Sequence, residues 1–409
     1  MDAIGTDAGN AVMPLMAGDQ SEATARDGSF DSAPSSRPRP LVLHLINGEH
    51  FSGAERVQQL LGQRLPEYGF RAEFACLKPG RFRQCSGLPG ELIHDFPMHS
   101  RADLRVATRL IEFTARSGVE LMHAHTPRTA LIAATVSLRL GLPWVYHVHS
   151  PTLWDSTRRW INRFNHAVEW VSLRRCTHLI TVSRSLRRYM LRRGMSRQRI
   201  TVVPNGVPAI DPIDAAARQN QRQWRLGLIA LMRPRKGVEV ALTALQQLRQ
   251  RGHAVSLDLI GGFETAKYRA HIEAMIHALQ IREHVNLQGF AQDVGACLRE
   301  LDVLLLPSLF GEGMPMVVLE ALSAGVPVVA TRVEGTPEVV RHGREGRLAV
   351  PGSATSLAAE VAEVLASRQR WMAMSHAAVE RHRECFSDQH MARGVARVYH
   401  EVLHASAVR

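Results

Sequence analysis

Two series of alternating strand and helix patterns, separated by one polar stretch, constrain the fold of this 409-residue chain more than any other feature. Short apolar runs predict strands at 41–46, 120–123, 144–149, 178–182 and 202–206, then at 226–231, 255–260, 285–287, 303–306 and 326–330. Amphipathic patterns predict helices at about 51–61, 104–117, 128–140, 239–251, 267–279 and 316–324. Strands that alternate with helices of this length pair in parallel, with helices on both faces of the sheet. The sequence therefore predicts an α/β protein built from two doubly wound domains.

The polar stretch and the chain ends set the expected domain boundaries. We expect a disordered leader at 1–38, an N-terminal domain at 39–208, a linker at 209–223, a C-terminal domain at 224–375 and a helical segment at 376–409 that packs across both domains. Doubly wound sheets bind ligands beyond the carboxyl ends of their strands. We therefore expect the functional site in a crevice between the two domains.

Composition favours an intracellular protein. The five cysteines have no paired spacing, which argues against a disulfide framework and a zinc site. No apolar stretch approaches the length of a membrane span, and residues 1–18 lack the pattern of a secretory signal. These features predict a cytoplasmic location.

The positive charge lies almost entirely in one segment. Residues 101–206 hold 18 Arg, no Lys and 5 Asp or Glu, an excess of 13 positive charges against +12 for the whole chain. Around Trp154, Trp160 and Trp170, arginine doublets lie near apolar residues, and Leu186, Tyr189 and Met190 fall on one side of a predicted helix. Such a stripe could rest on an anionic membrane, or it could belong to a half-buried helix with a solvated Arg face.

The most informative segment follows the strand at 303–306. It contains a Gly-rich turn with Glu312 and Gly313, and then enters a helix that carries Glu320. Backbone N–H groups at such a helix start, here those of Gly313, Met314, Met316 and Val317, form a site for phosphate. Two carboxylates beside a phosphate site suit a ligand that also carries hydroxyl groups, such as a nucleotide diphosphate sugar. The alternative is two solvated glutamates near a helix start.

A basic turn, Arg233-Pro-Arg235-Lys236-Gly237, follows the first strand of the second series. Cations aimed at a departing diphosphate lower the barrier to its departure. Lys236 is the best candidate because the chain has only two other lysines, Lys78 and Lys267. The alternative is a solvated turn that begins a helix.

Two His-x-His pairs end strands of the first series: His123 and His125, and His147 and His149. Side chains at strand ends would face the crevice, where His125 and His149 could hydrogen-bond a transferred sugar or an acceptor hydroxyl. For His123 and His147 the alternative is a structural role. A metal site is disfavoured, because no carboxylate or cysteine lies nearby.

The ordered set of motifs resembles the family-4 glycosyltransferases, which have the GT-B fold of two Rossmann-like domains facing across a cleft. The matching pieces are Ser52–Glu55, His123–His125, His147–Ser150, Thr181–Ser183, Pro204–Val207, Arg235–Gly237, Gly289–Phe290, Glu312 with Glu320, and Gly335–Glu338. The resemblance implies transfer of a sugar from a UDP- or GDP-sugar to an acceptor hydroxyl, with retention of configuration and no required metal or cofactor.

The resemblance also implies residue roles. Glu312 would contact the donor sugar, Glu320 the ribose, Lys236 the diphosphate and His149 the transferred sugar, while Gly53 would let the chain approach the phosphates. Family members usually have an arginine five or six residues before the lysine, where this chain has Leu231 and Ala230. Arg233 or Arg235 would have to replace it. In the loop after Glu312, Pro315 removes one candidate N–H donor.

The expected role is surface polysaccharide or glycolipid assembly, with a lipid-linked sugar acceptor at the inner membrane face. A sugar-nucleotide epimerase or phosphorylase of the same fold is the nearest alternative. An NAD-dependent oxidoreductase is disfavoured because the chain has no G-x-G-x-x-G. A nucleic-acid-binding protein would explain the charge but not the ordered motifs, so no nucleic-acid partner is expected.

Overall fold

The computed structural model describes residues 38–100, 103, 105–152, 159–214, 218 and 223–407, and only the backbone of 159–162 and 164. The predicted leader therefore lies outside the described residues except for Pro38, as does much of the predicted linker. Residues Arg39–Arg409 cluster as one unit. The domain boundaries stay predictions.

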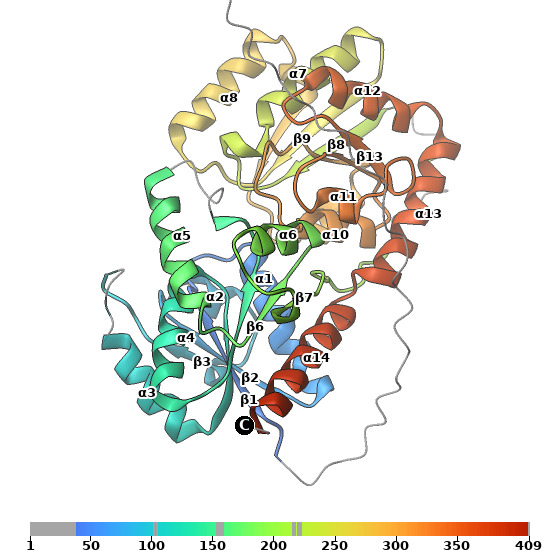
Figure 1. The fold of residues 1–409 in the computed structure, drawn as a ribbon. Helices are drawn as coiled ribbons and strands as arrows, with labels where there is room; N and C mark the ends of the chain where they lie inside the picture. The colour runs from blue at the N-terminus through green and yellow to red at the C-terminus, as the bar shows by residue number, and fades with distance from the viewer. Residues whose placement is uncertain are drawn as a thin grey trace, which may run out of the picture. The chain divides into compact units, whose positions relative to one another are not determined.

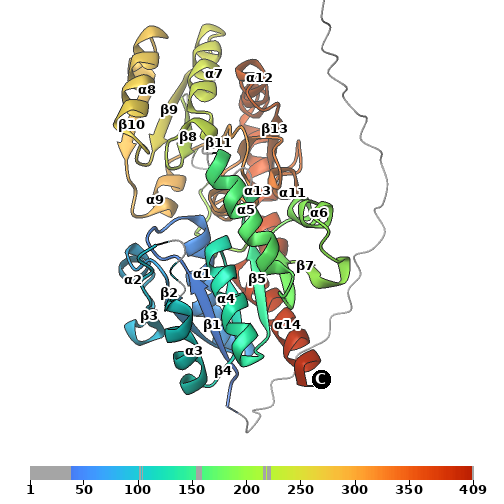
Figure 2. The same cartoon turned by 60° about the vertical axis from the view of Figure 1, so that its left-hand side comes forward.

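The first sheet has seven strands in the order β3-β2-β1-β4-β5-β6-β7, and all its neighbouring strands are parallel (Figures 1 and 2). Its strands are β1 (Leu41–Ile46), β2 (Arg71–Cys76), β3 (Ile93–Asp95), β4 (Val119–Ala124), β5 (Trp144–Val148), β6 (His178–Thr181) and β7 (Ile200–Val202). The helices between them are α1 (Gly53–Arg64), α2 (Arg81–Cys85), α3 (Arg105–Ser117), α4 (Pro127–Leu140), α5 (Arg159–Leu173) and α6 (Arg184–Arg192). Strands β1 and β5 are buried along their length, and β4 is buried except at Glu120, as expected when helices cover both faces.

The second sheet has six parallel strands in the order β10-β9-β8-β11-β12-β13. Its strands are β8 (Trp224–Ile229), β9 (Val255–Ile260), β10 (Val285–Gly289), β11 (Val303–Leu306), β12 (Val328–Thr331) and β13 (Gly346–Ala349). Its helices are α7 (Val238–Gln250), α8 (Ala266–Ala278), α9 (Val294–Arg299), α10 (Met316–Ser323), α11 (Thr336–Val339) and α12 (Ala354–Leu365). In both sheets the third, second, first and fourth strands lie in that order, which is the Rossmann arrangement. The prediction of two doubly wound α/β halves is confirmed.

Some elements differ from the prediction. The sequence pattern missed β2, β3 and β13. Charged residues or glycine interrupt the apolar runs of β2 and β13, and β3 has only three residues, Ile-His-Asp. The strand expected at 202–206 was wrong: β7 ends at Val202, and the following residues form a loop that contains Pro204. Proline cannot donate to a strand ladder, which favours ending the strand here.

Two long helices complete the chain, α13 (Arg368–Cys385) and α14 (Asp388–Ala407). Helix α13 packs on α10 and α12 of the second half, and α14 packs on α1 and β4 of the first half (Figure 1). The Arg64 guanidinium of α1 donates to the Asp388 carboxylate at 2.7 Å, at the start of α14. The C-terminal helices therefore contact both halves. No helix among the described residues is long and apolar enough to cross a bilayer.

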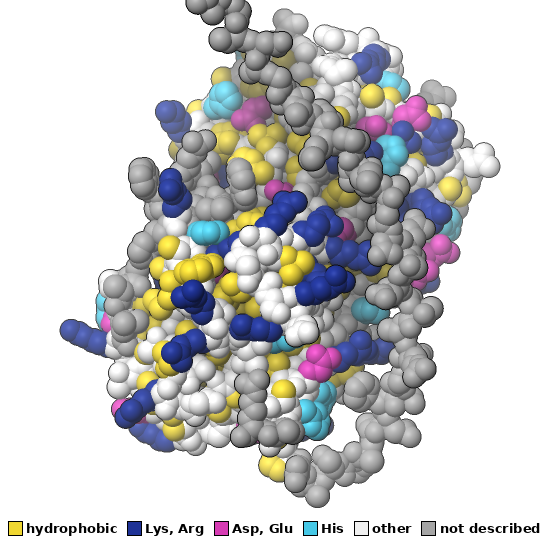
Figure 3. Space-filling view, in the orientation of Figure 1, with side chains coloured by type: hydrophobic (Ala, Val, Ile, Leu, Met, Phe, Trp, Pro, Cys, Tyr) yellow, Lys and Arg dark blue, Asp and Glu magenta, His cyan; other side chains and the backbone are white. Residues whose placement is uncertain are grey.

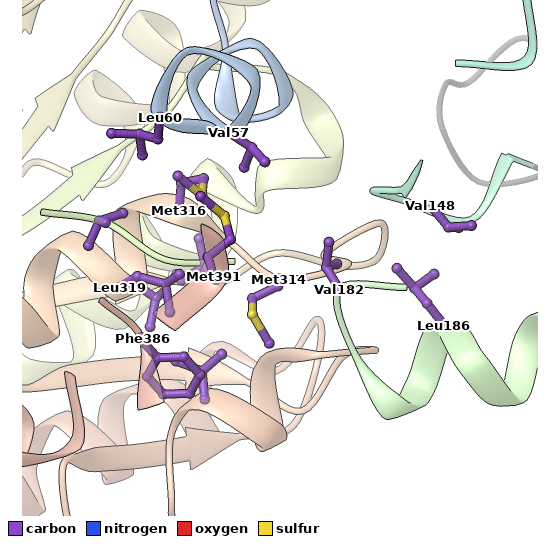
Figure 4. Packing of buried hydrophobic residues seen from close by; sticks show 14 of the residues in the cluster. Val57, Leu60, Val148, Val182, Leu186, Met314, Met316, Leu319, Phe386 and Met391 are labelled. Carbon is purple, nitrogen blue, oxygen red and sulfur yellow. The ribbon is translucent and has the colours of Figure 1, made fainter. Parts of the chain in front are cut away.

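The two halves share buried apolar contacts. Figure 4 shows Met314 and Met316 of the second half among Val57 and Leu60 of α1 and Met391 of α14. The backbone N–H of Asn205 approaches the Met314 sulfur at 3.2 Å. The loop that carries the predicted phosphate site is thus held against the first half.

Candidate active site

The loop after β11 and the turn after β8 meet because their strands are neighbours in the second sheet. The Lys236 ammonium donates to Oε1 of Glu312 at 2.5 Å, and the Ser308 hydroxyl donates to the same oxygen at 2.7 Å. A guanidinium nitrogen of Arg235 lies 3.6 Å from that oxygen. Residues 76 positions apart therefore form one buried cluster of two cations, one carboxylate and one hydroxyl.

Burial and charge act in opposite directions on this pair. Burial would raise the pKa of Glu312, but Lys236 and Arg235 hold the pKa below its usual value. Burial lowers the pKa of Lys236, and the Glu312 carboxylate opposes that shift. A carboxylate stays ionised in this environment only because cations face it. The cations, in turn, are partly stripped of water, so they would attract an anionic ligand strongly.

The Glu312 loop is pressed between two other backbone segments. A Cβ atom on Gly313 would lie 1.9 Å from the carbonyl oxygen of His149, just after β5. A Cβ atom on Gly335 would lie 1.8 Å from the Gly313 carbonyl oxygen. Glu334, whose φ is +30°, accepts a hydrogen bond from the Glu312 N–H at 3.1 Å. Only glycine fits at 313 and 335, and this close packing places His149 beside the loop.

Two helix starts converge next to this loop. Helix α10 begins at Met316, so the N–H groups of Met316 and Val317 have no partner within the helix. At the start of α1, a Cβ atom on Gly53 would lie 3.3 Å from the Met316 side chain. Both helices direct their positive ends to this point, which favours an anion there. Met314 and Met316 are buried, and Val317 is half-buried.

Glu320 is paired across the two halves. Nε of Arg56, on α1, lies 3.5 Å from Oε1 of Glu320, which lies on the second turn of α10. Burial raises the pKa of Glu320, and Arg56 acts in the opposite direction. A hollow of about 360 Å³ opens beside Arg56, lined also by Gln292, Asp293 and residues 209–211. The volume lies within the range of small-molecule sites.

The histidines of the first half form one buried cluster. His123, His125, His147 and His149 are joined by His44 of β1 and by Tyr399 of α14. Burial lowers the pKa of each of the five histidines, to about 3 for His44 and about 4 for His149. Two trios, His44 with His123 and His125, and His125 with His147 and His149, hold nitrogens within 4.8 Å of one another. No carboxylate or cysteine joins either trio among the described residues.

Of the two alternatives for the helix at 184–192, the structure shows the half-buried helix with a solvated Arg face and not an exposed apolar stripe. Leu186 and Met190 of α6 are buried in the core, and Tyr189 is half-buried. Arg193 makes a buried ion pair with Glu169, so its charge is already matched. Trp154 and the Trp160 side chain lie outside the described residues, and Trp170 is 38% exposed. The structure shows a half-buried helix whose solvated face carries Arg184, Arg188 and Arg192.

Two family models match this chain in succession. The model described as Glycosyltransferase Family 4 matches residues 51–209, and the one described as Glycosyl transferases group 1 matches residues 210–381. Their order along the chain is the order of the two sheets. The chain belongs to the family-4 glycosyltransferases. This confirms the resemblance drawn from the motifs.

Curated relatives of this glycosyltransferase include two bacterial proteins. It is 34% identical over 142 residues to WcaL of Salmonella typhimurium, a putative colanic acid biosynthesis glycosyltransferase, over 33% of this chain and 34% of WcaL. It is 32% identical over 183 residues to a GDP-mannose-dependent alpha-(1-6)-phosphatidylinositol monomannoside mannosyltransferase of Mycobacterium tuberculosis, over 41% of this chain and 47% of that enzyme. The chain spans about a third to a half of the length of these relatives.

Solved structures confirm the predicted GT-B fold. Anabaena HepE in complex with UDP and glucose has a TM-score of 0.78 and 20% identity, covering 88% of this chain and 100% of that one. Sucrose-phosphate synthase from Thermosynechococcus elongatus has a TM-score of 0.76 and 18% identity, covering 90% of this chain and 100% of that one.

The family comparison leaves open which arginine stands in for the missing one. Arg235 lies 3.6 Å from Glu312 and also donates to the carbonyls of Phe310 and Gly311, both at 3.2 Å. Arg233 lies 3.9 Å from Glu264, away from that carboxylate. The geometry therefore favours Arg235 as the second cation of the site.

Sequence reasoning missed several residues around the candidate site. Ser308 and Glu334, which hold Glu312, carry no signal in the motif pattern. Glu338 lay within a matching motif, and its carboxylate accepts from the backbone N–H groups of Arg184 and Ser185, both at 2.7 Å. This contact joins the second half to the start of α6. Tyr399 is separated from His123 by 276 residues, so only the fold could reveal it.

Proposed function

We propose that the chain transfers a hexose from a nucleotide diphosphate sugar to an acceptor hydroxyl, with retention of anomeric configuration. The observation that carries this is the buried Lys236–Glu312 pair, with Arg235, beside two converging helix starts. The cations and the helix ends suit a diphosphate, and the carboxylate suits sugar hydroxyls. Family membership supports the same reaction class.

The proposed roles follow the geometry. Before the donor binds, Lys236 is paired with Glu312; a diphosphate would then compete for the ammonium and free the carboxylate for a sugar hydroxyl. As the sugar–phosphate bond breaks, negative charge grows on the diphosphate, and Lys236 and Arg235 stabilise it. The proposed catalytic residues are His149, Lys236 and Glu312. The proposed donor-binding residues are Gly53, Arg233, Arg235, Lys236, Gly313, Met314, Met316, Val317 and Glu320.

The donor is proposed to be a UDP- or GDP-sugar. A HepE crystal contains UDP and glucose, and the mycobacterial relative is named as GDP-mannose-dependent, so both nucleotides enter the test. We expect one nucleotide family to raise the melting temperature in a panel of UDP-, GDP- and ADP-sugars. At 100 times its Kd a ligand stabilises the folded state by about 2.7 kcal/mol. No shift with any compound would contradict the proposal.

Transfer itself is tested with two variants. Glu312→Ala should abolish transfer, and Lys236→Ala should reduce turnover ~100-fold or more, because each removes charge at the reacting diphosphate or sugar. Lys267→Ala and Glu283→Ala are matched controls at exposed positions of the same half. Circular dichroism checks that each variant folds. Wild-type turnover in Lys236→Ala would contradict its role, and product formation without acceptor or only with orthophosphate would indicate an epimerase or a phosphorylase.

The acceptor is proposed to be a lipid-linked sugar met at the inner membrane face, in surface polysaccharide or glycolipid assembly. The names of relatives in colanic acid and amylovoran biosynthesis, and of a phosphatidylinositol mannosyltransferase, support this class. Figure 3 shows Lys and Arg side chains gathered on the face that carries α6. Reversing the exposed charges of Arg184, Arg188 and Arg192 should abolish co-sedimentation with anionic vesicles. Equal binding to neutral vesicles would contradict the membrane proposal.

A further inference from the structure

Four imidazole rings and one phenol form a continuous series of close polar contacts in the first half. Nε2 of His149 lies 3.0 Å from Nδ1 of His125, and Nε2 of His125 lies 3.1 Å from Nδ1 of His44. The Tyr399 hydroxyl then lies 3.4 Å from Nε2 of His44 and 2.6 Å from Nδ1 of His123. The series begins beside the Glu312 loop, passes through Tyr399 of α14 and ends at His123 of β4.

The ring geometry favours hydrogen bonds over a shared metal ion. The planes of His125 and His149 differ by 14°, and those of His44 and His125 by 18°. A nitrogen separation of 3.0–3.1 Å between such rings suits an N–H that points at a lone pair. Ligands of one ion would instead direct their lone pairs at a common point about 2.0–2.1 Å from each nitrogen. The contacts therefore form one continuous series of hydrogen bonds.

A neutral imidazole has one N–H and one lone pair. A ring that accepts a hydrogen bond at one nitrogen must therefore donate from the other, so the direction of one hydrogen bond sets the direction of the next. The rings are neutral because they are buried. Both nitrogens of His44 and of His125 are used within this series. The two end atoms are Nδ1 of His149 and Nε2 of His123, and both are buried without a partner among the described residues. The tautomer of His149 is thus coupled to the direction in which Tyr399 donates.

The shortest contact decides the direction. At 2.6 Å, the Tyr399–His123 contact suits an O–H donor, since N–H donors prefer about 2.9 Å. If Tyr399 donates to His123, its oxygen accepts from His44, His44 accepts from His125, and His125 accepts from His149. Nε2 of His149 then carries the proton and Nδ1 is a bare lone pair.

We propose that Tyr399, His44 and His125 are positioning residues that hold His149 in one tautomer, with Nδ1 presented to accept a hydrogen bond from a hydroxyl of the transferred sugar. The assignment of a sugar hydroxyl as the donor rests on the proposed function. The assignment of the His149 tautomer depends only on the hydrogen bonds among the histidines and Tyr399. Loss of that hydrogen bond would weaken transfer more than nucleotide binding, because the nucleotide is held by the other half.

The tautomer is tested by nitrogen NMR on the full chain labelled with ¹⁵N-histidine, with His149→Gln used for assignment. In the wild type, Nδ1 of His149 should show the shift of a bare nitrogen and Nε2 that of a protonated one. In Tyr399→Phe, which removes only the hydroxyl, both nitrogens should show averaged shifts. A protonated Nδ1 in the wild type, or an identical single tautomer in both proteins, would overturn the proposal.

Kinetics give an independent readout. Tyr399→Phe should reduce kcat about twofold, because averaged shifts mean that about half of the protein holds the productive tautomer, and should leave the Kd for UDP or GDP unchanged. His44→Gln keeps a donor and an acceptor and should retain more activity than His44→Leu. A parallel loss of kcat and nucleotide affinity would indicate a structural role and overturn the proposal.

The experiments also distinguish a failure of the proposed function, and the binding of a metal ion, from a failure of the tautomer proposal. If the wild type transfers sugar from no donor, the proposed function fails, while the NMR result still decides the tautomer. The alternative of a metal is tested by titrating the protein with Co²⁺ alone. Stoichiometric visible absorption that disappears in His125→Leu would overturn the proposal, because the metal would take the lone pairs that the series of hydrogen bonds requires. We expect no such absorption.

Discussion

The histidine cluster predicts that this protein loses stability in mildly acidic solution. His44, His123, His125, His147 and His149 all have a pKa lowered by burial, to about 3 for His44 and about 4 for His149. The unfolded chain, with ordinary histidines near pH 6.5, therefore binds more protons than the folded chain. Stability from these rings is fully present above about pH 6.5 and falls as the pH falls.

The size of the effect follows from proton linkage. His149, with an unfolded pKa of about 6.5 and a folded pKa of about 4, contributes a loss of about 1 kcal/mol at pH 5.5 and about 2 kcal/mol at pH 5.0. His44, His123, His125 and His147 add to this loss in the same direction, because burial lowers the pKa of each of them too. The window from pH 7.5 to 5.5 lies above the ordinary range of carboxylates, so histidines dominate it.

The assay is urea unfolding at constant ionic strength between pH 7.5 and 5.0, with Trp144, buried in β5, among the fluorescence reporters of the first half. His147→Leu is the informative variant, because both ring nitrogens of His147 are buried without a hydrogen-bond partner among the described residues. Its loss of stability between pH 7.5 and 5.5 should be smaller than that of the wild type, because the variant lacks one ring whose pKa is lowered by burial. His376→Leu, at an exposed position of α13, is the control. Equal stability at pH 7.5 and 5.5, or the same loss in His147→Leu, would refute the reasoning.

Three further outcomes follow from the contacts between the halves. Glu312→Gln should tighten UDP or GDP binding about tenfold or more in calorimetry, since a phosphate bound to Lys236 would lie about 5 Å from the carboxylate and be repelled by ~3 kcal/mol; weaker binding would contradict this. Gly313→Ala should destabilise the protein by about 1–3 kcal/mol in urea unfolding, because its Cβ would overlap the His149 carbonyl; an unchanged midpoint would show that the loop can move aside. Glu338→Gln should cost roughly 1 kcal/mol in the same measurement, through the lost charge at the start of α6, and wild-type stability would show that this contact is not formed in solution.

The local pattern of apolar residues predicted much of the fold. Apolar runs and helical periodicity predicted β1, β9 and β11 with the bounds that the structure has, because strands covered on both faces are mostly apolar. The same logic failed for β2, where exposed Arg71 interrupts the run. Strand β2 lies next to the edge strand β3 and is exposed at its first residue, so its sequence shows no clear apolar pattern.

Some features of the candidate site and its surroundings could be predicted from the sequence, and others could not. Glu312 and Lys236 could be singled out from sequence because each lies in a short motif after a strand, and parallel strands bring such ends together. The amphipathic pattern of α6, in contrast, could not say whether Leu186 and Met190 face a membrane or the core. Only the packing of α6 in the first half decided that they are buried.

What the sequence by itself determined is the succession of strands and helices, the two-domain α/β class and the short motifs at strand ends, since these depend on neighbours along the chain. What the tertiary structure alone decided is which distant groups share a buried environment. Ser308 and Glu334 around Glu312, Arg235 rather than Arg233, and Tyr399 beside His123 all depend on packing. Burial and proximity set the charge state and orientation of each group, and neither property can be read from residues separated by tens to hundreds of positions.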